Sequence, residues 1–285
     1  MDFLFHHSKI KKFITTYQKP YYHRLKILMA LLIIHFSLMA AMIVFIMISL
    51  VGIYIPIAVF TGYSVFAIYN YVKIYQANKI CKEEFYHLIA AIVRDDQEID
   101  LEYLKNYPRY RQAIKDTRLV HNYDAIGVYK VFQFAKAGIT GCFIDVSATR
   151  SQGNSSVTIL KGLVYIFDMD CSTNMQIRND PYKGVKCQKE KELSSNTYSV
   201  YSFDEQKNFA YSPSYGQKFG KIDRLSPQGV TAIDFQNNKI SVYIKRKNTL
   251  KIPREMNDVN ITSCCDELVD MVGLGRDIGV ILARY

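Results

Sequence analysis

The sequence predicts an α+β protein in which an N-terminal two-helix transmembrane hairpin is followed by a cytoplasmic, mostly antiparallel sheet with helices on one side. The first reason is the run from Ile27 to Val72, which contains no Asp, Glu, Lys or Arg, although 22% of the 285 residues are charged. The second reason is the alternation of apolar and polar residues after Asp124, which is typical of strands. Strands interrupted by only a few helices indicate the α+β class.

The length and composition are those of a chain with one or two folded parts. A domain holds about 150 residues, and an apolar content of 49% excludes a disordered or collagen-like chain. The patterns divide the chain into a basic cytoplasmic N-terminus (1–26), a transmembrane helical hairpin (27–75), a helical connector (76–124) and a cytoplasmic α+β domain (125–285).

The uncharged run is too long for one membrane span and fits two. A bilayer core about 30 Å thick needs roughly 20 apolar residues per helical span. Gly52 and Pro56 lie near the middle of the run, and Pro disfavours helix at and before its own position. We therefore expect helices at about Ile27–Val51 and Ile57–Tyr75, joined by a turn too short to hold an extracytoplasmic domain.

Basic residues flank the hairpin and are missing from its turn. Residues 1–82 hold a single acid, Asp2, so most of the net charge of +10 lies in this part of the chain. Because Lys and Arg concentrate on the cytoplasmic side of membranes, both termini are predicted to be cytoplasmic. Membrane lipids, and not nucleic acid, are the partner that this charge predicts. The nine membrane-flanking basic residues are Lys9, Lys11, Lys12, Lys19, Arg24, Lys26, Lys73, Lys79 and Lys82.

Inside the spans, His35 is the ionisable side chain of most interest. Ionisable groups within a membrane are often functional. A single neutral His near the interface without an acidic partner is more often merely tolerated, and we favour that interpretation.

The cytoplasmic part is predicted to begin with helices and to continue with strands. Residues 98–118 carry charges at nearly every turn, and Pro108 divides them into two short helices. Val157–Asp168 is apolar on both faces and is therefore expected to be a central strand. Polar residues and turn signals make 171–196 a predicted long loop. The other expected strands are Ile126–Phe134, Cys142–Thr149, Tyr198–Phe203, Val230–Phe235 and Ile240–Arg246.

Two helices are expected near the C-terminus. Pro213 lies in the favoured first turn of a helix that ends near Leu225, and apolar residues at helical spacing predict a second helix over 268–282. Three glycines cost this second helix about 1 kcal/mol each relative to Ala. For Gly275 and Gly279, two explanations stay open: a closely packed helix face or an irregular helix. In the last strand, Ile240, Val242 and Ile244 are expected to face the core, and Ser241, Tyr243 and Lys245 the solvent.

Three short motifs resemble an uncharacterised bacterial family of membrane proteins that contains a domain of unknown function. Ile159–Asp168 (ILKGLVYIFD) is similar to its "FKGLFF-x-x-D" strand, and Phe203–Pro213 is similar to its "Y-x-L-(S/T)-P" helix entry. Asn238–Ile244 resembles its "GKLYIAI" strand, with Asn238 where Gly is usual, and the C-terminal glycines are also atypical. The likeness covers the layout of residues 20–280. It implies two N-terminal spans in a bacterial inner (cytoplasmic) membrane and a cytoplasmic α+β domain, and it implies no activity.

No motif for a nucleophile, a bound phosphate or a zinc ion occurs. Asp168 and Asp170 end a strand and are weak candidates for a metal site, but two carboxylates without a third ligand are more often a solvated strand end. Asp145 is expected to form a cross-strand ion pair with Lys161. We therefore predict no catalytic residue, no metal and no cofactor.

Six cysteines are present without a CxxC pair: Cys81, Cys142, Cys171, Cys187, Cys264 and Cys265. In a cytoplasmic domain, reduced and buried thiols are the default. Palmitoylation or metal binding at the adjacent Cys264 and Cys265 is an alternative, but two small side chains at a helix start are the favoured interpretation.

The preferred function is a non-enzymatic, membrane-anchored protein whose cytoplasmic domain docks a protein partner, forms a homo-oligomer or helps to build a membrane complex. The missing catalytic motifs and the 22 tyrosines, which suit a protein interface, support this hypothesis. The alternative is an enzyme or small-ligand sensor at the membrane surface, with Asp168, Asp170 and the 171–196 segment near its site.

Overall fold

The computed structural model describes most of the chain in two compact units. The described residues are 3–48, 54–105, 107–120, 123–153, 155–169, 171, 173–179, 188–192, 198–203, 213–225, 230–236, 238–246, 250–253 and 255–283. One unit comprises residues 1–89 with 252–258, and the other comprises residues 90–251 with 259–285.

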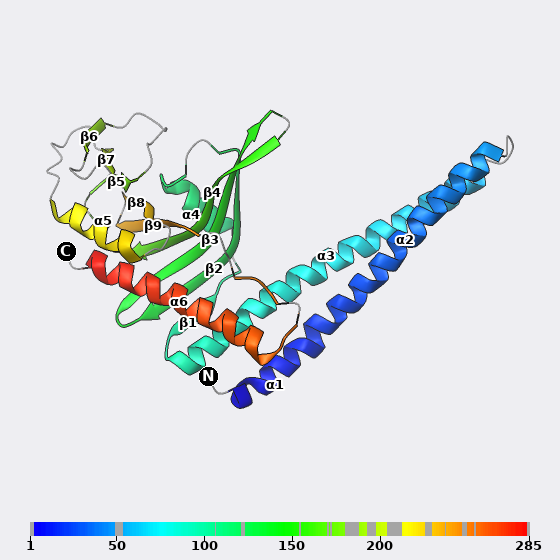
Figure 1. The fold of residues 1–285 in the computed structure, drawn as a ribbon, viewed down its shortest axis with the longest axis horizontal. Coiled ribbons are helices and arrows are strands. Elements are labelled where there is room, and N and C mark those ends of the chain that lie inside the picture. The colour runs from blue at the N-terminus through cyan, green and yellow to red at the C-terminus, as the bar shows by residue number, and fades with distance from the viewer. Residues whose placement is uncertain are drawn as a thin grey trace. The chain divides into compact units, whose positions relative to one another are not determined.

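The first unit is helical (Figure 1). Its helices are α1 (Phe3–Phe13), the short π-helix η1 (Ile14–Gln18), α2 (Lys19–Ile48) and the first part of α3 (Tyr54–Gln97). Helices α2 and α3 contact each other, because Tyr63 Oη donates a hydrogen bond of 2.5 Å to the carbonyl of Leu31. The imidazole of His35 stacks on the ring of the same tyrosine, with 5.6 Å between ring centroids.

Two boundaries in this unit differ from the prediction. The predicted basic N-terminus is helical from Phe3 onward, and α3 begins at Tyr54, so Pro56 lies in its first turn and not in the turn between helices. Proline is tolerated there because the first backbone N–H groups of a helix have no partner within the helix. Gly52, the other predicted turn residue, lies outside the described residues.

Among the described residues, one helical stretch within His6–Val44 is long and apolar enough to cross a membrane. Length and composition alone are weak evidence, because the core helix of a soluble protein meets the same criterion. Only 6% of its most apolar window is buried, however, whereas a core helix is mostly buried.

The described residues of the second unit form an open, nine-stranded antiparallel sheet with the strand order β1-β2-β3-β4-β9-β8-β5-β7-β6. The expected α+β class is therefore confirmed. Strand β4 lies between β3 and β9, in the interior of the sheet as predicted. The strands are β1 (Asp100–Tyr103), β2 (Ala125–Lys136), β3 (Ile139–Gln152), β4 (Ser155–Asp168), β5 (Met175–Arg178), β6 (Gln188–Glu192), β7 (Ser199–Ser202), β8 (Val230–Gln236) and β9 (Lys239–Lys245).

Helices cover both faces of this sheet, and the prediction of helices on one side is wrong. Helices α5 (Pro213–Leu225) and α6 (Asp258–Ala283) lie over one face (Figure 1), where the Cα of Gly275 in α6 approaches the ring of Tyr165. The neighbouring residue Val164 points to the opposite face and joins an apolar cluster with Ile114 of α4 (Tyr107–Asp116). Since both faces are covered, Ser241 and Tyr243 of β9, which were expected to face solvent, are also buried.

Two segments that were predicted to be helix or loop are strands. Residues 98–118 hold strand β1 before the single helix α4, and the predicted loop 171–196 holds β5 and β6. Strand β1 pairs with β2 at an edge of the sheet, so its charged residues alternate with buried Leu101 and Tyr103. Strand β5 is only four residues long, with two apolar and two polar side chains that are all buried, and its pairing with β7 and β8 stabilises it.

Gly275 and Gly279 allow α6 to approach the sheet closely, which is the first of the two open explanations. A Cβ atom added at Gly275 would lie 2.7 Å from the ring of Phe134, and one added at Gly279 would lie 2.3 Å from Cγ2 of Ile139. At Gly273, on another side of the same helix, an added Cβ would meet nothing within 4 Å. Two of the three glycines therefore lie at the helix–sheet contact.

Candidate functional site

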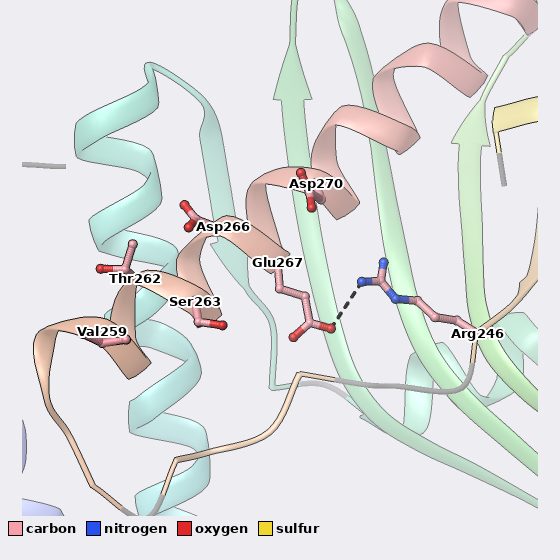
Figure 2. Close-up of a pocket in the computed structure, with 7 residues that line it drawn as sticks. All are labelled: Arg246, Val259, Thr262, Ser263, Asp266, Glu267 and Asp270. Atoms are coloured by element: carbon pink, nitrogen blue, oxygen red, sulfur yellow. Dashed lines mark hydrogen bonds and ion pairs between the residues drawn. The ribbon is translucent and has the colours of Figure 1, made fainter. Parts of the chain in front are cut away.

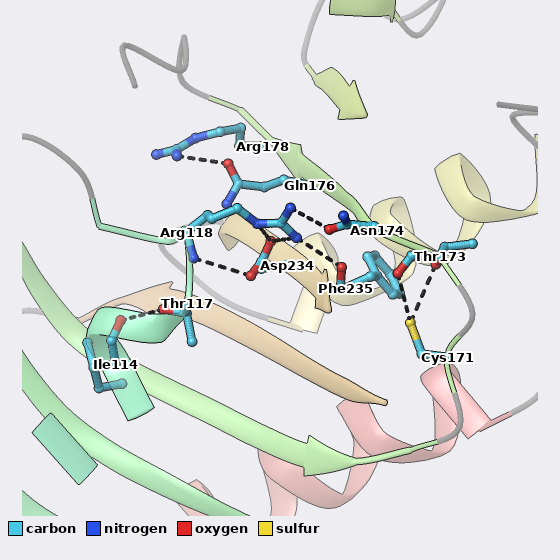
Figure 3. A network of polar contacts seen from close by, with 10 residues as sticks. All are labelled: Ile114, Thr117, Arg118, Cys171, Thr173, Asn174, Gln176, Arg178, Asp234 and Phe235. Atoms are coloured by element: carbon cyan, nitrogen blue, oxygen red, sulfur yellow. Dashed lines mark hydrogen bonds and ion pairs between the residues drawn. The ribbon is translucent and has the colours of Figure 1, made fainter. Parts of the chain in front are cut away.

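A buried polar network lies on the α4-covered face of the sheet (Figure 3). Arg118, which follows α4, donates from Nε to Oδ1 of Asp234 in β8 at 2.9 Å, and its backbone N–H donates to Oδ2 at 3.2 Å. The same guanidinium donates to Asn174 Oδ1 at 2.6 Å and to the carbonyl of Phe235 at 3.0 Å. It also lies 3.7 Å from the ring centroid of Phe203. One arginine thus connects the segment after α4 with β8 and with Asn174, the residue before β5.

Burial raises the pKa of the Asp234 carboxyl, and the charge and hydrogen bonds of Arg118 oppose that rise. Only 2% of Asp234 is exposed. Without Arg118, this buried carboxylate would lose its hydrogen-bonded ion pair.

Two residues of β5 extend this network. Arg178 Nη1 donates to Gln176 Oε1 at 3.1 Å, and both side chains are buried. Within the described part of the chain, Nε2 of Gln176 has no hydrogen-bond partner. Asp234, Gln176 and Arg178 are buried, and the side chain of Arg118 is 17% exposed. These contacts connect the segment after α4 with β8 and with the start of β5.

No local pattern in the sequence predicted this network. Arg118 and Asp234 are separated by 116 positions, and Gln176 and Arg178 lie in a segment that was predicted to be a loop. The 171–196 segment was expected to lie near a ligand site in the enzyme or sensor alternative. Its described residues instead include a buried strand of the sheet.

A second buried ion pair lies on the opposite face, under α6. Lys130 Nζ of β2 is 2.9 Å from Asp145 Oδ2 of β3, with side chains 10% and 5% exposed. The predicted partner of Asp145, Lys161, is wrong: Leu163 is the residue of β4 opposite Asp145, and Lys161 is opposite Ser147. A β-bulge in β2 between Val128 and Lys130 shifts the register, and Lys130 then lies opposite Asp145.

The cavity beside this pair is too small for a ligand. Its volume is about 10 Å³, and it is lined by apolar side chains of the sheet and of Met271 in addition to the pair itself. A space of this size holds one water molecule at most. The Lys130–Asp145 pair is therefore also part of the interior.

An open groove of about 720 Å³ lies along α6 (Figure 2). Arg246, which follows β9, approaches Glu267 with 3.3 Å between Nη2 and Oε1. Asp266 and Asp270 add two further carboxylates, and Val259 is an exposed apolar side chain at one end. In the described residues, no three His, Cys, Asp or Glu side chains converge as metal ligands.

The predicted site residues are spread over the molecule. Asp168 lies exposed at the end of β4, opposite Lys239 of β9, and Asp170 lies outside the described residues. His35 lies between the rings of Phe60 and Tyr63, and within the described residues its Nδ1 has no partner. All nine membrane-flanking basic residues are exposed on the helices of the first unit.

The described cysteines are free thiols. Burial raises the pKa of Cys142 to about 12, that of Cys264 to about 11 and that of Cys265 to about 12. These three thiols therefore stay protonated near neutral pH and are poor nucleophiles and poor metal ligands. Cys264 and Cys265 lie near the start of α6 as small buried side chains, in agreement with the favoured interpretation. Cys187 lies outside the described residues.

No family model, no curated protein and no solved structure matches this chain. Its function is therefore argued from its own residues.

Replacing Asp168 and Asp170 together with Asn tests the weak metal candidates. Asp168 is exposed at a strand end, and exposed substitutions change the free energy of unfolding by less than about 0.5 kcal/mol. We expect the thermal midpoint of the purified protein to shift by less than about 2 °C and its metal content, measured by elemental analysis, to stay the same. A metal that is bound by the wild type and lost by the double variant would contradict this expectation and favour the enzyme or sensor alternative.

Proposed function

We propose that the chain is a non-enzymatic membrane-anchored protein whose α+β unit docks a protein partner on the cytoplasmic side. The main support for the anchor is that apolar side chains are exposed on every side of α2 except the stripe of Leu28, Leu31 and His35 that faces α3. A helix that is apolar on all sides is stable when a protein core or a bilayer surrounds it, and this helix is mostly unburied. The exposed apolar side chains of α2 are Ile27, Met29, Leu32, Ile33, Ile34, Phe36, Met39, Ile43 and Val44.

The first part of α3 supports a second span. Its sequence to Val72 contains no charged residue, and most of its exposed side chains are apolar or aromatic. Tyr63 donates its hydroxyl proton to a carbonyl of α2, which satisfies a polar group that lipid cannot satisfy. Two spans in contact would form the predicted multi-pass hairpin.

The flanking charges support cytoplasmic ends in a bacterial inner membrane. The nine basic residues are exposed and lie before the apolar part of α2 and after that of α3. Lys73 Nζ lies 5.5 Å from the ring centroid of Tyr69, and exposed Tyr71 and Tyr75 lie on the same stretch of helix. Aromatic and basic side chains together are typical of the membrane–water interface.

The polar groups of the α+β unit favour docking over catalysis, because the buried ones stabilise the interior. The two buried constellations, around Asp234 and around Asp145, are ion pairs of the interior. The enzyme or sensor alternative was predicted to use Asp168, Asp170 and the 171–196 segment, whereas the open groove in the described residues lies on α6. We propose docking because burial keeps the thiols of Cys142, Cys264 and Cys265 protonated and because the carboxylates of the described residues do not converge as metal ligands.

Topology reporters test the anchor. Fusions at residue 12 and residue 285 are both expected to give a cytoplasmic signal, and alkaline carbonate should leave the protein in the membrane pellet. The physical reason is the charge asymmetry across the hairpin. An extracytoplasmic signal from either fusion, or release of the protein by carbonate, would rule out the two-span anchor.

Affinity purification of the detergent-solubilised full chain, followed by mass spectrometry, tests the docking role. A stoichiometric protein partner or a homo-oligomer is the expected result. A lone particle whose melting temperature rises with a small molecule, with the rise abolished by Asp266→Asn in the α6 groove, would replace docking with the sensor alternative.

A further inference from the structure

Strands β3 and β4 continue past the rest of the sheet as a two-stranded arm (Figure 1). The pairing of β3 with β2 ends at Thr149, opposite Ala125, and the pairing of β4 with β9 ends at Gly162, opposite Lys245. Beyond these positions, the described residues of the arm pair only with each other. We define the arm as residues 150–152 of β3 and 155–161 of β4.

The outer edge of β3 in this arm is closed by Asp124. Its backbone N–H donates to the carbonyl of Thr149 at 2.9 Å, and its carboxylate accepts the N–H of Ser151. That hydrogen bond holds the pKa of Asp124 below its usual value. On the β3 edge of the arm, the carbonyl of Thr149 and the N–H of Ser151 therefore have partners.

The outer edge of β4 in this arm has no backbone partner among the described residues. The backbone N–H and C=O groups of Thr149 and Ser151 point toward Asp124 and therefore away from β4. Thr158 and Ser156, which lie opposite them, form pairs that are not hydrogen-bonded to each other, so their N–H and C=O groups point away from β3. Among the described residues, nothing hydrogen-bonds to the outward N–H and C=O groups of Ser156 and Thr158. Unpaired groups in this arrangement match the backbone of another extended strand.

The side chains along this edge do not protect it. Natural edge strands are commonly blocked by Lys or Pro, whereas Ser155–Leu160 contains neither and carries no charge. Val157 and Ile159 are 43% and 42% exposed. The β-bulge opposite Ala148 and Thr149 makes Ile159 the extra residue, so the regular part of the edge is Ser155–Thr158.

We propose that this edge pairs with the same edge of a second copy of the chain, in an antiparallel, two-fold arrangement. The register that joins the outward groups of Ser156 to those of Thr158 in the second copy places the two Val157 side chains directly opposite each other. Two copies of this segment are compatible in that register, because neither carries a charge that would repel the other and because β-branched side chains pair well across strands.

This inference deepens the proposed function, since it names the partner of the docking unit. Two-fold pairing is the commonest symmetry of homo-oligomers. Anchoring in one membrane also raises the effective concentration of the copies, so a short edge is enough for association.

Cysteine cross-linking of the full chain in membranes tests the pairing. Opposed residues that are not hydrogen-bonded to each other have Cα atoms about 4.5 Å apart, which is within disulfide range. With an added oxidant, Val157→Cys is expected to form a disulfide-linked dimer at least tenfold more than Thr140→Cys, an exposed control at the other end of β3. The wild type gives the background from the native cysteines. Equal cross-linking of the two variants would overturn the proposal.

Two further variants test the same contact without cross-linking. Ser156→Pro removes an N–H group that points away from β3, so the hydrogen bonds between β3 and β4 stay intact. Val157→Lys places two like charges opposite each other in the dimer. Each is expected to raise the dissociation constant of the detergent-solubilised dimer at least tenfold, measured by analytical ultracentrifugation, with an unchanged circular dichroism spectrum. Val259→Lys, at an exposed position on α6, is the matched control and should leave the dimer intact.

The outcomes separate this proposal from the proposed function. A monomeric wild type that still captures another protein would overturn the self-pairing and leave docking in place. A Val157→Cys variant linked to a different protein would have the same meaning. A two-copy assembly that carbonate releases from the membrane would support the self-pairing and contradict the anchor.

Discussion

Replacing Asp145 with Ala is expected to lower the free energy of unfolding by about 3–5 kcal/mol. The substitution leaves the Lys130 ammonium, which is 10% exposed, without the carboxylate 2.9 Å away. An uncompensated charge in the interior costs more than the lost contact itself. Urea unfolding of the solubilised full chain, followed by circular dichroism, gives the measurement, because the chain has no Trp for fluorescence.

Two controls decide whether burial is the cause. Asp277→Ala removes the carboxylate of an exposed ion pair with Arg276 and should change the free energy of unfolding by less than about 1 kcal/mol. The double variant Lys130→Met with Asp145→Leu replaces both charges with apolar groups and should recover most of the stability. A single variant as stable as the wild type would show that the pair is not buried in the folded protein.

Gly279→Ala is expected to lower the free energy of unfolding by about 1–3 kcal/mol, although Ala is the better helix former. The added methyl group would lie 2.3 Å from Ile139 Cγ2, so α6 or the β2–β3 hairpin must shift. Gly273→Ala in the same helix meets nothing within 4 Å and should raise the free energy of unfolding by up to about 1 kcal/mol.

This pair of variants separates helix propensity from packing. Both replace Gly with Ala in α6, so both gain the same propensity, and only Gly279 lies at the helix–sheet contact. Opposite signs in urea unfolding are the expected result. Equal stabilisation by both would show that α6 does not lie on the sheet as described.

The long strands and the helices were predictable because each has a local pattern of its own. Alternation in 142–149 predicted β3, the apolar stretch ending at Asp168 predicted β4, and Pro213 marked the start of α5. Strands β1 and β5 have four residues each, and their sequences, DLEY and MQIR, lack the adjacent β-branched and aromatic residues that marked the equally short β7. Their pairing partners, which lie elsewhere in the chain, make them strands.

The sequence by itself determined the apolar N-terminal helix, the α+β class and the exposed basic residues. These properties follow from periodicity and charge along the chain. Tertiary structure alone decided which residues meet. Asp145 has a neighbour on each side in the sheet. A bulge in β2 places Lys130 on one side, and the register of β3 with β4 places Leu163, and not Lys161, on the other. Arg118 contacts Asp234 only because the strand order of the sheet brings β8 beside the end of α4. Contacts between distant segments depend on strand order and register, which no local pattern specifies.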